Sequence, residues 1–182
     1  MWYVVTNGSE ANQMKTDQPG TEVPLAAGIA AEEETVPVAK PPKPVSAKKI
    51  DELADAALAA MRSRATELNI TGVGVVAYAQ GDSIQEWTSK MAVVGRMTMP
   101  PAATNKGTNF LAIAYAKAAQ MADTLENSGT AARAPMIGEF TWRGGVIARV
   151  KTGYVIVAFS GASADEDVDV SRAGLGVLKA GL

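Results

Sequence analysis

RGGVIARVKTGYVIVAFSGASADEDVDVSRAGLGVLKAGL is the stretch from Arg143 to Leu182, and it decides the fold. It predicts a hairpin, with strands over residues 140–150 and 153–160 joined by a turn that ends at Gly153. A helix over residues 164–179 follows. Ser163 stands three residues before Glu166, the spacing of a capping box, in which each side chain accepts a hydrogen bond from the other residue's backbone N–H. We therefore expect two antiparallel strands that run into a capped helix.

The sequence upstream of this stretch predicts two more helices and two or three more strands. Apolar residues at spacings of three and four predict a helix over residues 47–69. A valine-rich strand over residues 71–79, a tight turn at Gly81-Asp82 and a second strand over residues 84–87 form the expected first hairpin, with a further strand around residues 91–97. An alanine-rich helix is predicted over residues 108–127, with Thr108 as its N-cap and Gly129 just after its C-terminal end. A loop over residues 130–139 completes the order.

Neighbouring strands joined by short turns indicate an antiparallel sheet, because parallel strands need long crossovers. We expect an α+β fold in α-β-α layers, with an antiparallel sheet of about five strands flanked by helices. The 182 residues, 47% of them hydrophobic, suffice for one sizeable core.

The chain has no cysteine and no histidine, and this restricts its chemistry. Disulfides, thiolate nucleophiles, Ser-His-Asp and Cys-His catalysis, ordinary zinc sites and histidine ligation of haem iron are all excluded. Acid–base or binding chemistry therefore depends on Asp, Glu, Lys, Arg, Tyr, Ser, Thr or the backbone.

Charge and hydropathy also limit the partners. No apolar run approaches the roughly 18 residues that span a bilayer, so we expect no membrane span. The formal net charge of −2 and the few aromatic residues argue against nucleic-acid binding. The first residues lack the basic segment of a signal peptide, which predicts a cytoplasmic location by default, or a periplasmic or secreted one if a signal peptide has been removed.

Residues 1–46 form a Pro-rich, acidic arm that precedes the predicted domain of residues 47–182. Six of the nine prolines lie in this arm, and proline lacks the amide donor that helix interiors and sheets require. The arm is acidic and the segment of residues 90–151 is basic. We expect the arm to dock on an oligomer of the chain, on its own subunit or on a neighbour.

Three sequence blocks, in order, carry a resemblance to a known family. They are Arg96-Met97, the Lys-Ala pattern around Lys117, and the C-terminal block with Gly144-Gly145 and Phe159-Ser-Gly-Ala-Ser163. Over residues 47–182 the chain resembles the GlcG/HbpS-like family, which includes the C-terminal domain of PduO-type proteins. The resemblance implies a profilin-like fold and self-association into a homo-oligomer. Some relatives bind haem or a related tetrapyrrole, but here no histidine is present to ligate it.

The basic residues of these blocks, Arg96, Lys117 and Arg143, are candidates for one anion-binding site, since arginine offers a fork for carboxylates and lysine a mobile charge. Gly144 and Gly145 are candidates for close approach of the backbone to the ligand. Alternatively, each basic residue is a solvated charge or an ion-pair partner, and Lys117 lies at the edge of a helix face with only its stem buried. The acidic residues at positions 165–167 fit the start of a helix better than a metal site, and we expect no metal.

The sequence predicts a small-ligand-binding, oligomeric domain whose ligand is anionic or planar, a tetrapyrrole included. Haem iron also accepts Tyr and Met ligands, here represented by Tyr78, Tyr115, Tyr154, Met97 and Met99, though such residues are commonly core. One alternative is a cofactor-independent lyase, isomerase or hydrolase for a small carboxylate-bearing substrate, with Lys117 or Glu139 as acid or base and Arg143 holding the substrate. Another is a non-catalytic accessory subunit of a protein complex. Whether the chain is an enzyme is left open.

Overall fold

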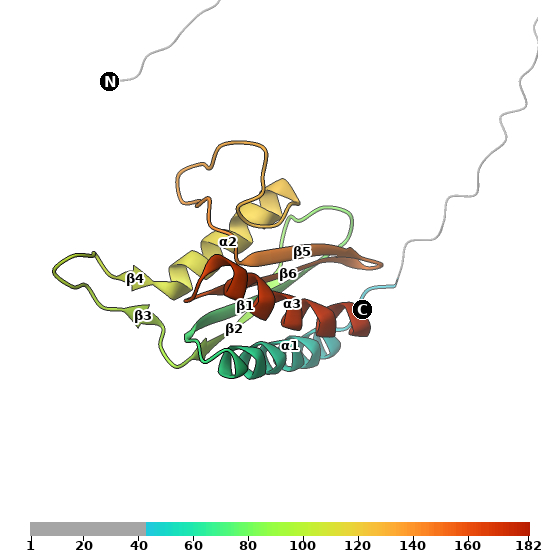
Figure 1. Cartoon of the computed structure of the whole chain (residues 1–182). Coiled ribbons are helices and arrows are strands. Elements are labelled where there is room, and N and C mark those ends of the chain that lie inside the picture. The colour runs from blue at the N-terminus through green and yellow to red at the C-terminus, as the bar shows by residue number, and fades with distance from the viewer. Residues whose placement is uncertain (1–42) are drawn as a thin grey trace, which may run out of the picture. The chain divides into compact units, whose positions relative to one another are not determined.

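Three helices cover the two faces of a four-stranded sheet (Figure 1). The computed structural model describes residues 43–182. Its helices are α1 (Ala47–Glu67), α2 (Phe110–Thr124) and α3 (Ala164–Gly181). Its strands are β1 (Gly72–Gln80), β2 (Thr88–Val94), β3 (Thr98–Met99), β4 (Thr108–Asn109), β5 (Gly145–Val150) and β6 (Gly153–Ser160). Helices α1 and α3 pack together on one face of the sheet and α2 lies on the other.

The sheet has the strand order β2-β1-β6-β5, and every neighbouring pair is antiparallel. The short strands β3 and β4 form a separate two-stranded ribbon. The predicted α+β class with an antiparallel sheet is confirmed, with four strands in the main sheet where about five were expected.

The core is divided by the sheet, because alternate residues of a strand point to opposite faces. On one face Val76 of β1 and Phe159 of β6 join the apolar side chains of α1 and α3. On the other face Ala77 and Ile156 pack with Met121 of α2. Both central strands are therefore buried on both sides, which explains why their sequences are almost wholly apolar.

The helix starts follow from side-chain caps. Ser46 accepts from the backbone N–H of Lys49 at the start of α1. The capping box of Ser163 and Glu166 at the start of α3 is present as predicted. For α2 the prediction was wrong in detail: Asn109, not Thr108, is the cap, and the helix ends at Leu125 in the left-handed conformation (φ 57°) before it reaches Gly129.

The first hairpin differs from the prediction. Residues 81–87 form a loop and not a tight turn with a strand, and the expected strands over 84–87 and 91–97 are replaced by the single strand β2. Arg149 and Tyr154 of the neighbouring hairpin hold the start of this loop through hydrogen bonds to the carbonyl oxygens of Gly81 and Asp82. Ile84 and Trp87 are then partly buried by packing against the α2 side of the core and have no strand partner.

The last hairpin also starts later than predicted, at Gly145 and not at residue 140. In the segment of residues 140–143, the carbonyl oxygen of Phe140 accepts a hydrogen bond from Gln120 Nε2 of α2 at 3.2 Å and does not pair with a strand. This segment thereby becomes a wall next to the sheet end.

The predicted arm of residues 1–46 lies outside the described residues except for positions 43–46, so its docking stays a prediction. Within positions 43–182, no helix combines the length and the hydropathy that crossing a membrane requires.

Candidate functional site

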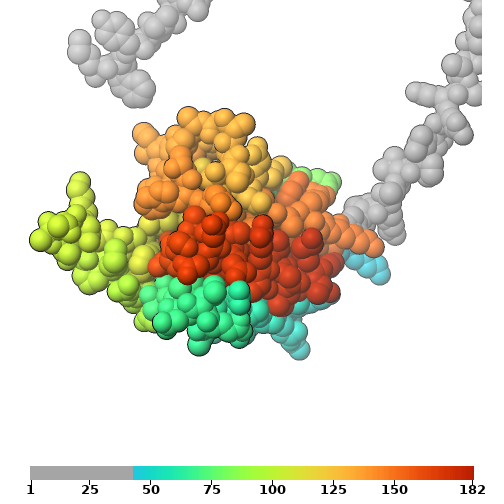
Figure 2. Space-filling model, viewed as in Figure 1, coloured from blue at the N-terminus to red at the C-terminus, as the bar shows by residue number. Residues whose placement is uncertain are grey.

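A pocket of about 520 Å³ lies at the end of the sheet where β2 and β6 end and β5 begins. This volume is within the range of about 300–1,000 Å³ that is usual for small-molecule sites. The ribbon of β3 and β4, the loop before β5 and the start of α3 contribute to its walls. Figure 2 shows the yellow-green ribbon projecting from the body of the domain and the orange loop rising beside it.

The pocket combines apolar and basic side chains. The apolar part comes from the ribbon, from α2 and from the loop before β5, through Met99, Phe110, Ile113 and Trp142. All three basic residues singled out in the sequence, Arg96, Lys117 and Arg143, also line it. The end of the sheet therefore brings together three basic residues that lie up to 47 positions apart in the chain.

Lys117 is buried and paired, which differs from the expectation that only its stem is buried. Its side chain is 2% exposed, and its Nζ donates to Asp167 Oδ2 and to the carbonyl oxygen of Phe159, both at 2.8 Å. Asp167 Oδ1 accepts from the backbone N–H of Ala162 at 3.0 Å. The pair thus connects α2 with α3 around the end of β6.

Burial dominates the protonation chemistry of this pair. It lowers the pKa of the Lys117 ammonium and raises the pKa of the Asp167 carboxyl, because the charged form of each group loses its hydration. The mutual attraction of the two charges and their hydrogen bond oppose both shifts. The Lys117 ammonium is paired with Asp167 and is not a free positive charge of the pocket.

The two arginines supply the accessible positive charge. Arg143 Nη1 lies 3.0 Å from Asp165 Oδ1, in a pair whose side chains are 50% and 83% exposed. Arg96 is exposed, with its Cζ 6.0 Å from the centre of the Phe110 ring, and it makes no ion pair with the described residues. A guanidinium in this position is open to an anion from solvent.

Gly144 and Gly145 pack behind the pocket and are not among the residues that line it. Gly144 has φ 142°, and a Cβ at this position would lie 2.8 Å from Asp167 Cβ and against the Lys117 ammonium. A Cβ on Gly145 would lie 2.5 Å from Met121 Cε. Both glycines therefore let the start of β5 approach the buried ion pair and α2, while direct contact with a ligand stays a prediction.

Glu139, the second candidate acid or base, lies outside the pocket. Arg133 donates to both of its carboxylate oxygens, at 2.7 and 2.8 Å, and the Met136 backbone N–H donates to Oε2 at 2.8 Å. The hydrogen bonds from Arg133 lower the pKa of Glu139 to about 2. This carboxylate stays ionised and organises the loop of residues 131–142.

Two residues at this end of the sheet were not predicted from the sequence: Trp142, which lines the pocket, and Gln120, which bonds the loop before β5. Trp142 stacks on Phe140, with ring centres 4.8 Å apart and planes 9° apart. Gln120, only 3% exposed, bonds both Phe140 and the backbone N–H of Gly129. The helical spacing from Phe110 through Lys117 to Met121 places Gln120 next to the buried face, but nothing in the sequence shows that residue 142 meets the same pocket.

Of the five residues named above as candidate haem ligands by residue type, only Met99 is among those that line this pocket. Tyr78 donates to the carbonyl oxygen of Thr152, and the hydroxyls of Tyr115 and Ser89 are hydrogen-bonded to each other. Tyr154 lies under Arg149, whose Cζ is 4.7 Å from the ring centre.

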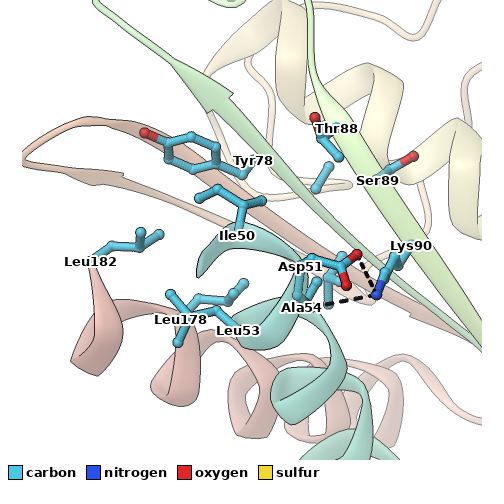
Figure 3. A pocket seen from close by; sticks show the side chains of 12 residues that line it. Ile50, Asp51, Leu53, Ala54, Tyr78, Thr88, Ser89, Lys90, Leu178 and Leu182 are labelled. Atoms are coloured by element: carbon cyan, nitrogen blue, oxygen red, sulfur yellow. Dashed lines mark hydrogen bonds and ion pairs between the residues drawn. The ribbon is translucent and has the colours of Figure 1, made fainter. Parts of the chain in front are cut away.

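A second cavity lies between α1, α3 and the strands β1 and β2, lined by Ile50, Tyr78 and Leu178 (Figure 3). Its volume is about 20 Å³, enough for about one water molecule. Its charged group, Lys90, is held by Asp51 at 2.6 Å and Asp55 at 2.9 Å. The pocket at the sheet end, which combines apolar walls with two exposed arginines, is therefore the candidate ligand site.

Comparison with known proteins finds similarity at the level of solved structures. No family model matches the sequence, and no curated protein matches it. The chain is similar to a PduOC:heme complex, with 18% identity, a TM-score of 0.47 and coverage of 73% of this chain and 94% of that one. It is also similar to an HbpS double mutant from Streptomyces reticuli, with 20% identity, a TM-score of 0.41 and coverage of 85% and 99%. A further structure of HbpS gives 18% identity, a TM-score of 0.38 and coverage of 82% and 99%. PduOC and HbpS are the proteins that the sequence resemblance names.

Proposed function

We propose that the chain binds a small organic anion in the pocket at the sheet end, with Arg96 and Arg143 as the groups that hold its carboxylate. The observation that carries this proposal is the meeting of two accessible guanidiniums at one apolar pocket. A guanidinium binds a carboxylate through two parallel hydrogen bonds, which gives both affinity and orientation.

Binding is favoured over acid–base catalysis by the state of the two candidate residues. The Lys117 ammonium is engaged by Asp167 and Phe159, and Glu139 is held by Arg133 away from the pocket. Binding is also favoured over a purely structural role as an accessory subunit, because a pocket of about 520 Å³ is present. Self-association stays a prediction, and a native mass spectrum of the purified full chain measures it together with any retained ligand.

The experiment compares 2-naphthoate with 2-naphthamide, which has the same ring and no charge, in titrations of the full chain. Wild-type protein should prefer the carboxylate, and Arg96→Met and Arg143→Met should each weaken naphthoate binding by on the order of 2 kcal/mol, or about thirtyfold. Neither substitution should change the free energy of unfolding by more than about 0.5 kcal/mol, since both side chains are exposed.

Arg149→Met is the matched control, because Arg149 is another exposed, ion-paired arginine and lies on the β5–β6 hairpin outside the pocket. It should bind naphthoate as wild type does. Equal affinity of the wild type for naphthoate and naphthamide, or normal binding by both pocket variants, would contradict the proposal.

The resemblance to haem-binding proteins makes haemin a second probe. The sequence holds no histidine, so we expect no spectrum typical of histidine-ligated haem iron on adding haemin. Met99 is the one residue of a ligating type among those that line the pocket. A spectrum of methionine-ligated iron that is lost in Met99→Leu would move the proposal from a simple carboxylate to a tetrapyrrole.

A further inference from the structure

We infer that the anion bound at the sheet end is an aromatic carboxylate, and that Trp142 is the residue that selects the ring. This inference rests on the proposed function, and it adds the class of ligand and a specificity-determining residue. It comes from the position of Trp142 in the pocket lining and from the stacking of its ring on Phe140.

Trp142 lines the pocket, and Phe140 covers one face of its ring. Its neighbour Phe140 stacks on it almost in parallel, at 4.8 Å and 9°, and Phe140 does not line the pocket. Trp142 is nevertheless 50% exposed. Phe140 leaves the other face of the ring open, and a flat ring that stacks on that face extends a two-ring stack to three.

The loop that carries Trp142 is held in place before any ligand arrives. Gln120 donates to the carbonyl oxygen of Phe140 at 3.2 Å and accepts from the backbone N–H of Gly129 at 2.9 Å. Gly129 has φ 71°, and a Cβ there would lie 2.6 Å from the carbonyl oxygen of Thr141. A position prepared in this way lowers the entropy that binding must overcome.

The remaining walls fit the other parts of such a ligand. Phe110 and Ile113, on the first turns of α2, are apolar and almost fully buried. Arg96 lies above the Phe110 ring, so its guanidinium marks the charged end of the pocket, and Arg143 directly follows Trp142. A ring against Trp142 with a carboxylate near the arginines satisfies the apolar and the charged parts together.

The size of the expected selectivity follows from the energy of aromatic pairs. A stacked pair is stabilised beyond simple burial by an amount that corresponds to between about twofold and about tenfold in affinity. Benzoate and cyclohexanecarboxylate have the same charge and nearly the same size, and only benzoate has a π face. Their affinity ratio therefore isolates the contribution of the ring.

The experiment titrates the full chain with 2-naphthoate, benzoate and cyclohexanecarboxylate, followed by calorimetry. Wild-type protein should bind benzoate between about twofold and about tenfold more tightly than cyclohexanecarboxylate, and naphthoate more tightly still. Trp142→Leu should bring benzoate and cyclohexanecarboxylate to the same affinity, whereas Trp142→Phe should keep the preference. Ile137→Ser is the matched control, because Ile137 is fully exposed on the same loop and does not line the pocket.

The outcomes separate this inference from the proposed function. Equal binding of benzoate and cyclohexanecarboxylate by the wild type, or a preference that survives in Trp142→Leu, overturns the role of Trp142 and leaves anion binding intact. Failure of all three carboxylates to bind overturns both. Circular dichroism of each variant identifies a loss of binding that comes from misfolding. If Trp142→Leu misfolds, the preference of Trp142→Phe for benzoate over cyclohexanecarboxylate decides whether the role of Trp142 stands.

Discussion

If the pocket binds an anion as proposed, Asp165 competes with it for Arg143. The side chains of Arg143, which lines the pocket, and Asp165 meet at 3.0 Å, and Asp165 belongs to the first turn of α3. Because the pair is 50% and 83% exposed, it is worth only about 0.2–1 kcal/mol. A carboxylate that binds Arg143 as proposed would displace Asp165 at a small cost, so we expect this residue to reduce the affinity without preventing binding.

Asp165→Asn should therefore tighten the binding of 2-naphthoate by up to about fivefold, measured by calorimetry at low ionic strength. Asp169→Asn, on the same helix, removes a carboxylate that pairs with Arg64 at 2.6 Å and not with the pocket, and its affinity should be unchanged. Weaker binding by Asp165→Asn would show that Asp165 orients Arg143 for the ligand and does not compete with it.

At this scale the sequence predicts which residues carry charge, but not which charges are accessible. Arg96, Lys117 and Arg143 line one pocket, but the Lys117 ammonium is buried against Asp167, as an ion-pair partner would be, and the role of these residues in binding stays a prediction. Trp142 was missed because aromatic stacking depends on the path of the loop, and the hydrogen bonds from Gln120 that set this path join residues with no periodic relation.

Helices α2 and α3 lie on opposite faces of the sheet, and the pair of Lys117 and Asp167 joins them at its end. Such a buried pair stabilises a fold less than its short distances suggest, because both groups lose hydration. Its loss on one side is nevertheless costly, since the remaining charge has no partner.

Lys117→Met should lower the free energy of unfolding by about 3–5 kcal/mol in urea denaturation, because it leaves the Asp167 carboxylate buried and unpaired. The double variant Lys117→Met/Asp167→Asn should recover much of this loss. It removes the buried charge and keeps an oxygen that accepts from the Ala162 N–H. A double variant no more stable than Lys117→Met would show that the lysine contributes by its packing alone.

The existence of this pair was readable in principle from helical periodicity. Lys117 falls on the same face of α2 as Phe110, Ile113 and Ala114, all buried, and Asp167 falls with Val170, Ser171 and Gly174 on α3. A charged residue on an apolar face needs a partner, and each helix contains one. The acidic cluster at residues 165–167 concealed this, because a helix start explains it equally well.

For the molecule as a whole, the buried hydrophobic side chains among residues 43–182 lie between Ile50 and Leu178. Val45 packs on the edge of that core and Ser46 caps α1, so both contact the domain that is predicted to start at residue 47.

Deletion of residues 1–42 should therefore leave the helix and strand content and a single cooperative unfolding transition unchanged, as measured by circular dichroism. Deletion of residues 1–46 should cost about 1 kcal/mol more, because it removes the cap of α1. We expect both deletions to weaken self-association, which sedimentation measures. A chain of residues 43–182 that does not unfold cooperatively would place part of the core in the first 42 residues.

The element order was predictable because glycine-bounded valine runs and amphipathic helices are local signals. The order of strands was not, since it depends on which apolar faces meet. The predicted strand over residues 84–87 was wrong for this reason: Ile84 and Trp87 pack, partly buried, against the α2 side of the core and not against a neighbouring strand.

The central position of β1 and β6 in the sheet also determines the order in which the elements of the domain form during folding. Val73 pairs with Ser160 and Gln80 with Gly153, so the middle of the sheet closes a loop that spans most of the domain. Contacts of such high sequence separation form slowly. During synthesis the two hairpins and α2 are made before this closure, whereas the pocket needs residues from Arg96 to Asp167. The pocket at the sheet end is therefore incomplete on the nascent chain, and the proposed ligand would act on the folding equilibrium only after the first turn of α3 has left the ribosome.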